Sequence, residues 1–130
     1  MRAYQSFYEA HRDKADIYLV YILEAHFVEK DASGNYLSGW PIGYQYNYPQ
    51  TKTMEERKAM VELMLDEYHP TIPVLIDQMD NAFQNAYHPW PDRAVAFVDG
   101  VLRYISMVDD NGSRPCPWTD EIERLMPTWA

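Results

Sequence analysis

The sequence predicts an α/β fold, in which short strands alternate with helices. Ile17 to Leu23 are seven consecutive apolar or aromatic residues, a pattern typical of a strand buried on both faces. Thr53 stands three residues before Glu56 at the start of a helical pattern, which forms a capping box. Asp99-Gly100 separates two apolar runs rich in β-branched residues and indicates a hairpin turn. These observations favour one parallel crossover followed by one antiparallel hairpin.

The first half of the chain predicts two helices and one strand. Helical spacing of apolar residues from Ala3 indicates an opening helix of about 13 residues, and a strand at 16–23 follows it. Residues 24–52 form a connection rich in Tyr, Gly and Pro, and connections longer than about 12–15 residues are often functional lids. The helix that begins at the capping box ends at His69-Pro70. In that capping box we expect the Thr53 hydroxyl to accept from the Glu56 amide, and the Glu56 side chain to accept from the Thr53 amide. One face of this helix carries Arg57, Met60, Val61, Met64, Leu65 and Tyr68.

The second half predicts a strand at 72–76, a helix at 80–87, strands at 94–98 and 101–107, and a last helix that Thr119 caps and Pro127 stops. The predicted order is therefore α-β-α-β-α-β-β-α in a single domain, 1–130. This order is the thioredoxin-like layout, without the central strand that usually precedes its first long helix. Without that strand, backbone groups of the strands at 17–23 and 94–98 are left unpaired. We therefore expect these strands to pair directly, to accept a partner's strand in a homodimer, or to leave the monomer poorly stable.

The composition excludes some classes of partner. The 130 residues carry a net charge of −9, from 20 acidic and 11 basic residues, and such a field repels phosphate backbones and anionic membranes. We therefore expect neither nucleic acid nor a membrane as partner, although the acidity also serves plain solubility. The single cysteine, Cys116, predicts a reducing, cytoplasmic setting, and no apolar run reaches the roughly 18 residues of a membrane span.

Several motifs occur in an order that resembles the iodothyronine deiodinase family, including its bacterial deiodinase-like members. The strand end Tyr21-Ile22-Leu23-Glu24-Ala25-His26 is similar to that family's Tyr-Ile-x-Glu-Ala-His. The other similar blocks are Ser38-Gly39-Trp40, Pro49-Gln50, Thr53 to Arg57, Ile76 to Asn81, Ala86-Tyr87 and Trp90 to Arg93, which leads into Val95 to Gly100.

The resemblance implies a thioredoxin-fold oxidoreductase that reductively dehalogenates iodothyronine or another halogenated phenol. It implies no bound cofactor, and a thiol reductant serves as co-substrate. The family's nucleophile is a selenocysteine or cysteine in a turn that would lie just before Met1, and Thr51 stands where vertebrate members carry histidine. We therefore expect the residues as given to be inactive, as in a reading frame begun after a selenocysteine codon. Two alternatives stay open: a thiol-peroxidase-like (peroxiredoxin-like) enzyme, and a non-catalytic binding or assembly domain.

Glu24 and His26 are the first candidates for catalysis. At positions i and i+2 of a strand, their side chains would leave the same face. An imidazole titrates near neutral pH, so it can shuttle protons. By resemblance, His26 would polarise the phenolic substrate and pass protons, and Glu24 would orient it. The alternative is a capping carboxylate and a solvent-facing histidine.

Arg93 is the third catalytic candidate and also a substrate-binding one. Its guanidinium is always charged and suits a thiolate, selenolate, phenolate or carboxylate, and the alternative is an ion pair with Asp92 or Asp77. In the aromatic connection, Trp40 and Tyr44 are the candidates to close over an aromatic substrate, or simply to cover the sheet end. Cys116 is interpreted as a bystander. The histidines lack a metal-binding spacing, so no metal is expected.

Overall fold

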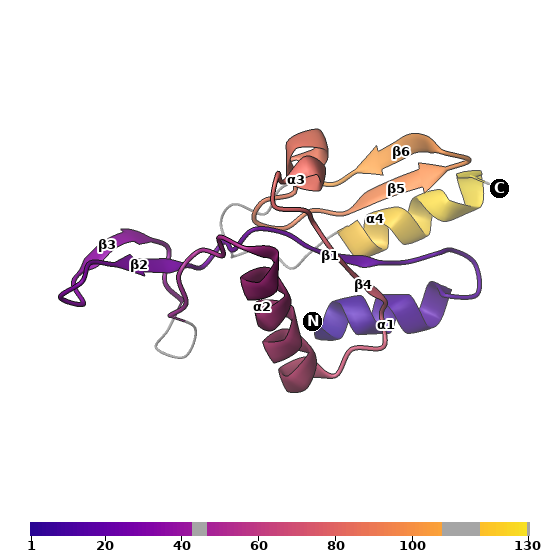
Figure 1. The fold of residues 1–130 in the computed structure, drawn as a ribbon. Helices are drawn as coiled ribbons and strands as arrows, with labels where there is room; N and C mark the ends of the chain where they lie inside the picture. Colours follow the sequence, from indigo (N-terminus) through magenta and orange to yellow (C-terminus); the bar gives the residue numbers. More distant parts are fainter. Residues whose placement is uncertain (43–46, 108–117, 130) are drawn as a thin grey trace. The chain divides into compact units, whose positions relative to one another are not determined.

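The computed structural model describes residues 1–42, 47–107 and 118–129. The described chain is mixed α/β, with four α-helices and three two-stranded sheets among these residues. Figure 1 draws these elements coloured along the sequence. The chain divides into two compact units, Met1–Phe83 and Gln84–Ala130. Each unit is described by itself below.

The first unit contains a parallel strand pair and two helices. Helix α1 (Arg2–His11) precedes strand β1 (Leu19–Tyr21), and helix α2 (Met54–Tyr68) precedes strand β4 (Val74–Ile76). Strands β1 and β4 pair in parallel, with Leu19 opposite Val74 and Tyr21 opposite Ile76. Helix α1 and strands β1 and β4 are shorter than expected, whereas α2 spans the expected residues.

Strand β1 is not buried on both faces, which corrects the sequence-based expectation. All three of its residues are only half-buried, Tyr18 just before it is 53% exposed, and Leu75 of β4 is 49% exposed. The reason is that β1 belongs to a two-stranded sheet, with β4 as its ladder partner. The expected pairing of 17–23 with 94–98 is not among the ladders of the described residues.

Helix α2 begins at the predicted cap. The Glu56 amide donates to the Thr53 hydroxyl oxygen at 3.1 Å, while the Glu56 carboxylate accepts from the Lys52 amide at 2.6 Å. The expected return bond to the Thr53 amide is therefore replaced by one to the preceding residue. The helix ends at His69, whose φ of 45° is left-handed, and its buried side chains are Arg57 and Val61.

The connection between β1 and α2 holds an antiparallel hairpin that was not predicted. Strand β2 (Val28–Lys30) pairs with strand β3 (Tyr36–Gly39), with Val28 opposite Gly39. The turn depends on Asp31, whose carboxylate accepts from the amides of Ser33 and Asn35, each at 2.9 Å. These hydrogen bonds, above all that from the Asn35 amide, lower the pKa of Asp31. The run from Asp31 to Asn35 between two short alternating segments was the sequence signal for this hairpin.

Gly39 closes the hairpin where a side chain would not fit. Its φ is +128°, and a Cβ at this position would lie 2.0 Å from the carbonyl oxygen of Phe27. The close approach lets the Trp40 amide donate to the Phe27 oxygen at 3.0 Å. Gly39 therefore determines where Trp40 leaves the hairpin.

The second unit contains an antiparallel hairpin and the last helices. Helix α3 (Ala82–Tyr87) crosses the boundary between the units, and strands β5 (Val95–Val98) and β6 (Val101–Ile105) follow it. The predicted turn is confirmed, because Asp99 and Gly100 both have positive φ, 51° and 76°. Helix α4 (Trp118–Leu125) and a 3-10 helix, η1 (Met126–Trp129), complete the unit. Thr119 therefore lies inside α4 rather than capping it, and Pro127 lies inside η1 rather than ending the helical region.

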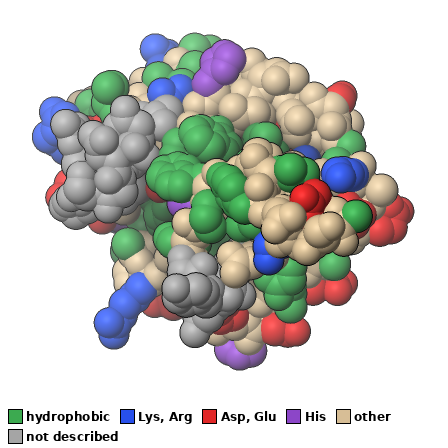
Figure 2. Space-filling model, turned by 90° about the vertical axis from the view of Figure 1, so that its left-hand side faces the viewer, with side chains coloured by type: hydrophobic (Ala, Val, Ile, Leu, Met, Phe, Trp, Pro, Cys, Tyr) green, Lys and Arg blue, Asp and Glu red, His purple; other side chains and the backbone are tan. Residues whose placement is uncertain are grey.

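The described residues bury few large apolar side chains. The buried ones are Phe7, Val28, Val61, Ile72 and Ile122. On the β2–β3 hairpin and the chain beside it, large apolar side chains are exposed, including Leu37 at 62% and Ile42 at 52%. Figure 2 views the molecule from the left-hand side of Figure 1 and shows hydrophobic side chains on that face. Within the described ranges, no helix has the length and apolar character needed to cross a membrane.

Candidate functional site

In the first unit, polar and charged side chains lie close to the ends of β1 and β4. The Asp77 amide donates to the Tyr21 carbonyl at 2.8 Å, which extends the ladder beyond β4. After Tyr21 the chain leaves the sheet, so Glu24 and His26 lie in the irregular segment between β1 and β2. The expectation that they share one face of a strand is therefore wrong. Their side chains are instead held by different partners.

Glu24 is half-buried and held from two sides. The Tyr21 hydroxyl donates to its carboxylate. The Gln50 side chain brackets its main chain, accepting from the Glu24 amide and donating to the Glu24 carbonyl, each at 2.9 Å. Burial raises the pKa of Glu24, while the Tyr21 hydrogen bond and the charges of Arg57 and His26 lower it. Burial, assisted by the hydrogen bond to Glu24, also raises the pKa of Tyr21.

Arg57 is the buried cation of this site, and sequence reasoning missed its role. It is 1% exposed. Its Nη1 donates to the carbonyl oxygens of Asp77 at 2.8 Å and Gln78 at 2.9 Å, and its Nη2 donates to Asn81 Oδ1 at 3.1 Å. Its Nε donates to the Thr51 hydroxyl at 3.4 Å. The sequence signal was an arginine within the otherwise apolar face of α2. A side chain on such a face becomes buried, and a buried charge needs hydrogen-bond partners.

His26 is oriented by Trp40. The Nδ1 atom of His26 lies 3.0 Å from the Trp40 carbonyl oxygen, and the two rings are 4.6 Å apart at their centroids with a 53° tilt. A carbonyl oxygen only accepts hydrogen bonds, so Nδ1 carries the proton and Nε2 of the neutral ring is the acceptor. The structure thus brings two predicted site residues together, and Trp40 is itself 44% exposed. The hydrogen-bonded orienting group of His26 is the Trp40 carbonyl rather than Glu24.

Arg93 lies in the second unit, just before β5. Its Nη1 donates to the Tyr87 carbonyl at 3.0 Å, while its buried Nε has no hydrogen-bond partner among the described residues. Tyr87 in turn packs edge-on against Phe97 at 5.6 Å. The guanidinium is therefore anchored at one nitrogen and retains a donor at another. The hydrogen bond described for Arg93 is to this carbonyl rather than to the carboxylate of Asp92 or Asp77, the alternative that the sequence left open.

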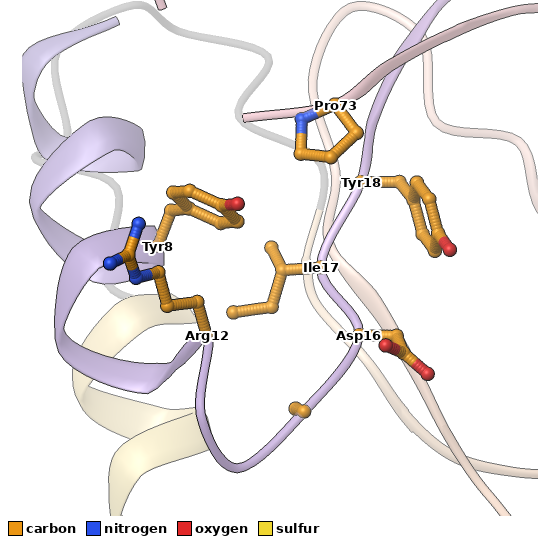
Figure 3. Close-up of a pocket in the computed structure, with 7 residues that line it drawn as sticks. Tyr8, Arg12, Asp16, Ile17, Tyr18 and Pro73 are labelled. Atoms are coloured by element: carbon orange, nitrogen blue, oxygen red, sulfur yellow. The ribbon is translucent and has the colours of Figure 1, made fainter. Parts of the chain in front are cut away.

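Other predicted residues contribute less. Tyr44 and Cys116 lie outside the described residues. No group of three or more His, Cys, Asp or Glu side chains in the described part of the chain is arranged to hold a metal ion. A separate pocket of about 90 Å³ lies between α1 and the segment leading to β1, where Tyr8 and Ile17 face each other and Tyr18 points away (Figure 3). It contains none of the predicted site residues.

Comparison with known proteins gives a consistent family. A family model described as iodothyronine deiodinase matches residues 1–121. The chain is 33% identical to thyroxine 5-deiodinase of Sparus aurata over 108 residues and 31% identical to that of Aquarana catesbeiana over 105 residues, each covering 80% of this chain. It is 24% identical to type I iodothyronine deiodinase of Xenopus laevis over 101 residues, 78% of this chain. The match spans only 35–36% of the length of these relatives.

Proposed function

The chain belongs to the iodothyronine deiodinase family, and from this premise we propose that it is the substrate-facing part of an oxidoreductase that removes iodine from a phenolic ring. The substrate class is iodothyronine or another halogenated phenol, and the reductant is a thiol. In the overall reaction an aryl iodide and two thiols give the aryl hydrogen compound, iodide, a proton and a disulfide. The carbon–iodine bond breaks, a carbon–hydrogen bond forms, and the thiols are oxidised.

The observation that carries this proposal is the His26–Trp40 pair. Nδ1 of His26 is committed to the Trp40 carbonyl at 3.0 Å, so Nε2 is the nitrogen that remains to accept from a phenol. The exposed Trp40 ring beside it offers a flat apolar face on which an aromatic ring can stack. One end of a phenolic substrate would thus meet an acceptor and the other an aromatic surface. Tyr44 lies outside the described residues and stays a sequence-based candidate for substrate binding.

The half-buried Glu24 supports proton transfer through His26. Its carboxylate acts electrostatically on the imidazole, and a nearby anion stabilises an imidazolium as it forms. Glu24 is therefore proposed to stabilise the charged form of His26, while Trp40 fixes its tautomer. This division of roles replaces the simpler one in which Glu24 orients the ring directly.

Arg93 is proposed to hold the anion of the reaction, whether a thiolate, a selenolate or a phenolate. The support is its donor capacity: Nη1 is anchored on the Tyr87 carbonyl, and the buried Nε makes no hydrogen bond among the described residues. A planar guanidinium with an open donor suits such an anion. The chalcogen nucleophile itself is proposed to come from outside these 130 residues.

The fold is proposed to be thioredoxin-like. The support is the parallel pair β1–β4 joined by α2, followed by the antiparallel hairpin β5–β6 and then α4. Exposed apolar side chains on β6, such as Val101 at 51% and Ile105 at 45%, support the further proposal that the protein forms a homodimer. Light scattering on a size-exclusion column tests this, and a monomer at micromolar concentration contradicts it. A cytoplasmic location is also proposed, from the single cysteine.

The test of function uses a protein in which the family's nucleophile, as cysteine or selenocysteine, is present together with residues 1–130. Iodide release from an iodinated phenol with a dithiol is measured for the wild-type protein, for His26→Ala and for the matched control His69→Asn. His69 is an exposed histidine at the left-handed end of α2, where asparagine is tolerated. We expect His26→Ala to lower kcat by about 100-fold or more and the control to change it little.

Three results would contradict the proposal. Iodide release that survives His26→Ala unchanged removes the role assigned to the imidazole. Peroxide turnover faster than iodophenol turnover in the same protein identifies the peroxidase alternative instead. Binding of the phenol without any turnover identifies a non-catalytic binding domain.

A further inference from the structure

Arg57 is the most deeply buried charged group described in the first unit, and the proposed reaction does not yet use it. It is 1% exposed, and its hydrogen-bond acceptors among the described residues are all neutral oxygens. Burying a cation among neutral partners costs free energy that packing alone does not repay. The contacts of Arg57 therefore bear on which other group its charge and fixed geometry serve.

The geometry connects Arg57 to the candidate site through the ends of both strands. Its Nη1 holds the carbonyl of Asp77 at 2.8 Å, and the amide of that same residue donates to the Tyr21 carbonyl at 2.8 Å. The Tyr21 hydroxyl then donates to the Glu24 carboxylate. Three hydrogen bonds, connected through Asp77 and Tyr21, therefore link the guanidinium to Glu24.

We propose that Arg57 is a positioning residue for the candidate site, which holds the ends of β1 and β4 so that Tyr21 can bind Glu24 and which places a positive charge where it acts on the Glu24 carboxylate. This inference rests on the proposed function and adds a residue on α2 to the same site. The charge of Arg57 acts on both Tyr21 and Glu24, since it lowers the pKa of Glu24 and opposes the burial that raises the pKa of Tyr21. The titratable groups that act on Glu24 are thus Tyr21, Arg57 and His26.

The test reads the charge of Glu24 directly. The side-chain carboxyl of Glu24 is followed by ¹³C NMR across pH in the wild-type chain, in Arg57→Met and in Lys58→Met. Lys58 is the exposed neighbour on the same helix, so its variant loses the same charge without touching the site. We expect the titration midpoint of Glu24 to move upward in Arg57→Met, because the opposing cation is gone, and to stay in place in Lys58→Met.

A second variant keeps the test decisive if Arg57→Met does not fold. Asn81→Gly removes the side-chain oxygen that accepts from Nη2, and Asn81 has a φ of 55°, a conformation that glycine adopts without cost. We expect a smaller upward shift of the Glu24 midpoint in this variant. A midpoint in folded Asn81→Gly that coincides with the wild-type one overturns the inference.

The reaction adds a second readout in the nucleophile-bearing protein. We expect Asn81→Gly to lower kcat by about tenfold with little change in KM, and to move the acid limb of the kcat profile upward in pH. The titration of Glu24 needs no halogenated substrate, so the proposed function and the role of Arg57 can be refuted independently. A shifted Glu24 midpoint without iodide release overturns the proposed function alone, and iodide release with an unshifted midpoint overturns the role of Arg57 alone.

Discussion

Removing the Gln50 side chain should loosen the segment that carries Glu24. Gln50 makes two hydrogen bonds of 2.9 Å to the Glu24 main chain, one to its amide and one to its carbonyl. Each neutral hydrogen bond contributes about 0.5–1.5 kcal/mol net. These two hydrogen bonds are only half-buried, so water replaces part of them in Gln50→Ala. We therefore expect the free energy of local opening at Glu24 to fall by about 1–2 kcal/mol, the lower part of the summed range.

The local assay is hydrogen exchange of the Glu24 amide, measured by NMR. Because about 1.4 kcal/mol corresponds to a tenfold change in an equilibrium constant, a loss of about 1–2 kcal/mol predicts exchange roughly 5- to 30-fold faster in Gln50→Ala. The same variant should reduce iodide release in the nucleophile-bearing protein, since the carboxylate is no longer held in place beside His26.

A matched control exists in the same unit. The Gln5 side chain accepts from the Thr71 amide at 3.0 Å and donates to the Thr71 hydroxyl, but this bracket is exposed. Gln5→Ala should leave the Glu24 amide unaffected and lower the free energy of unfolding by less than about 0.5 kcal/mol. Exchange of the Glu24 amide within about twofold of wild type in Gln50→Ala would refute the reasoning, because the bracket would then carry no local stability.

Three further outcomes are expected. Burial raises the pKa of Glu24 above its ordinary value of 4.5. The contribution of Glu24 to stability is therefore fully present below that pH and is lost as the pH rises through the native pKa. Glu24→Gln should remove this pH dependence of the free energy of unfolding, measured in urea, and an unchanged dependence would contradict the argument. Gly39→Ala should destabilise the protein by at least about 2 kcal/mol, whereas Gly34→Ala, which has a φ of +83° but open space around it, should cost about 1 kcal/mol; equal thermal unfolding midpoints would contradict the clash. Finally, ¹⁵N NMR of His26 at high pH should show the proton on Nδ1, and a proton on Nε2 would show that the Trp40 carbonyl does not hold the ring.

Short-range features were predicted well from the sequence. The Thr53 cap, the end of α2 at His69 and the hairpin turn at Asp99-Gly100 all depend on residues within a few positions of each other. In each case one side chain or one backbone angle decides the local conformation, so the residue type alone is informative. The family resemblance was likewise carried by short blocks in order, and the family match over residues 1–121 confirms it.

What the sequence could not determine was the environment of each side chain. The run from Ile17 to Leu23 reads as fully buried, but its exposure depends on how many strands share the sheet, and here β1 pairs with β4 in a sheet of two. Likewise, Glu24 and His26 look like a strand pair only while the strand is assumed to continue past Tyr21. The end of the ladder with β4 decides that it does not.

The sequence by itself therefore determined the family and supplied the candidates Glu24, His26 and Trp40. Only the tertiary structure showed that Trp40 holds the imidazole, that Gln50 brackets Glu24 and that Arg57 is the buried cation beside them. The physical reason is that these partners are 14 to 26 positions apart along the chain for His26 and Glu24, and 20 for Arg57 and Asp77. Hydrogen bonds across such separations depend on how the segments fold back on one another, which local residue preferences do not specify.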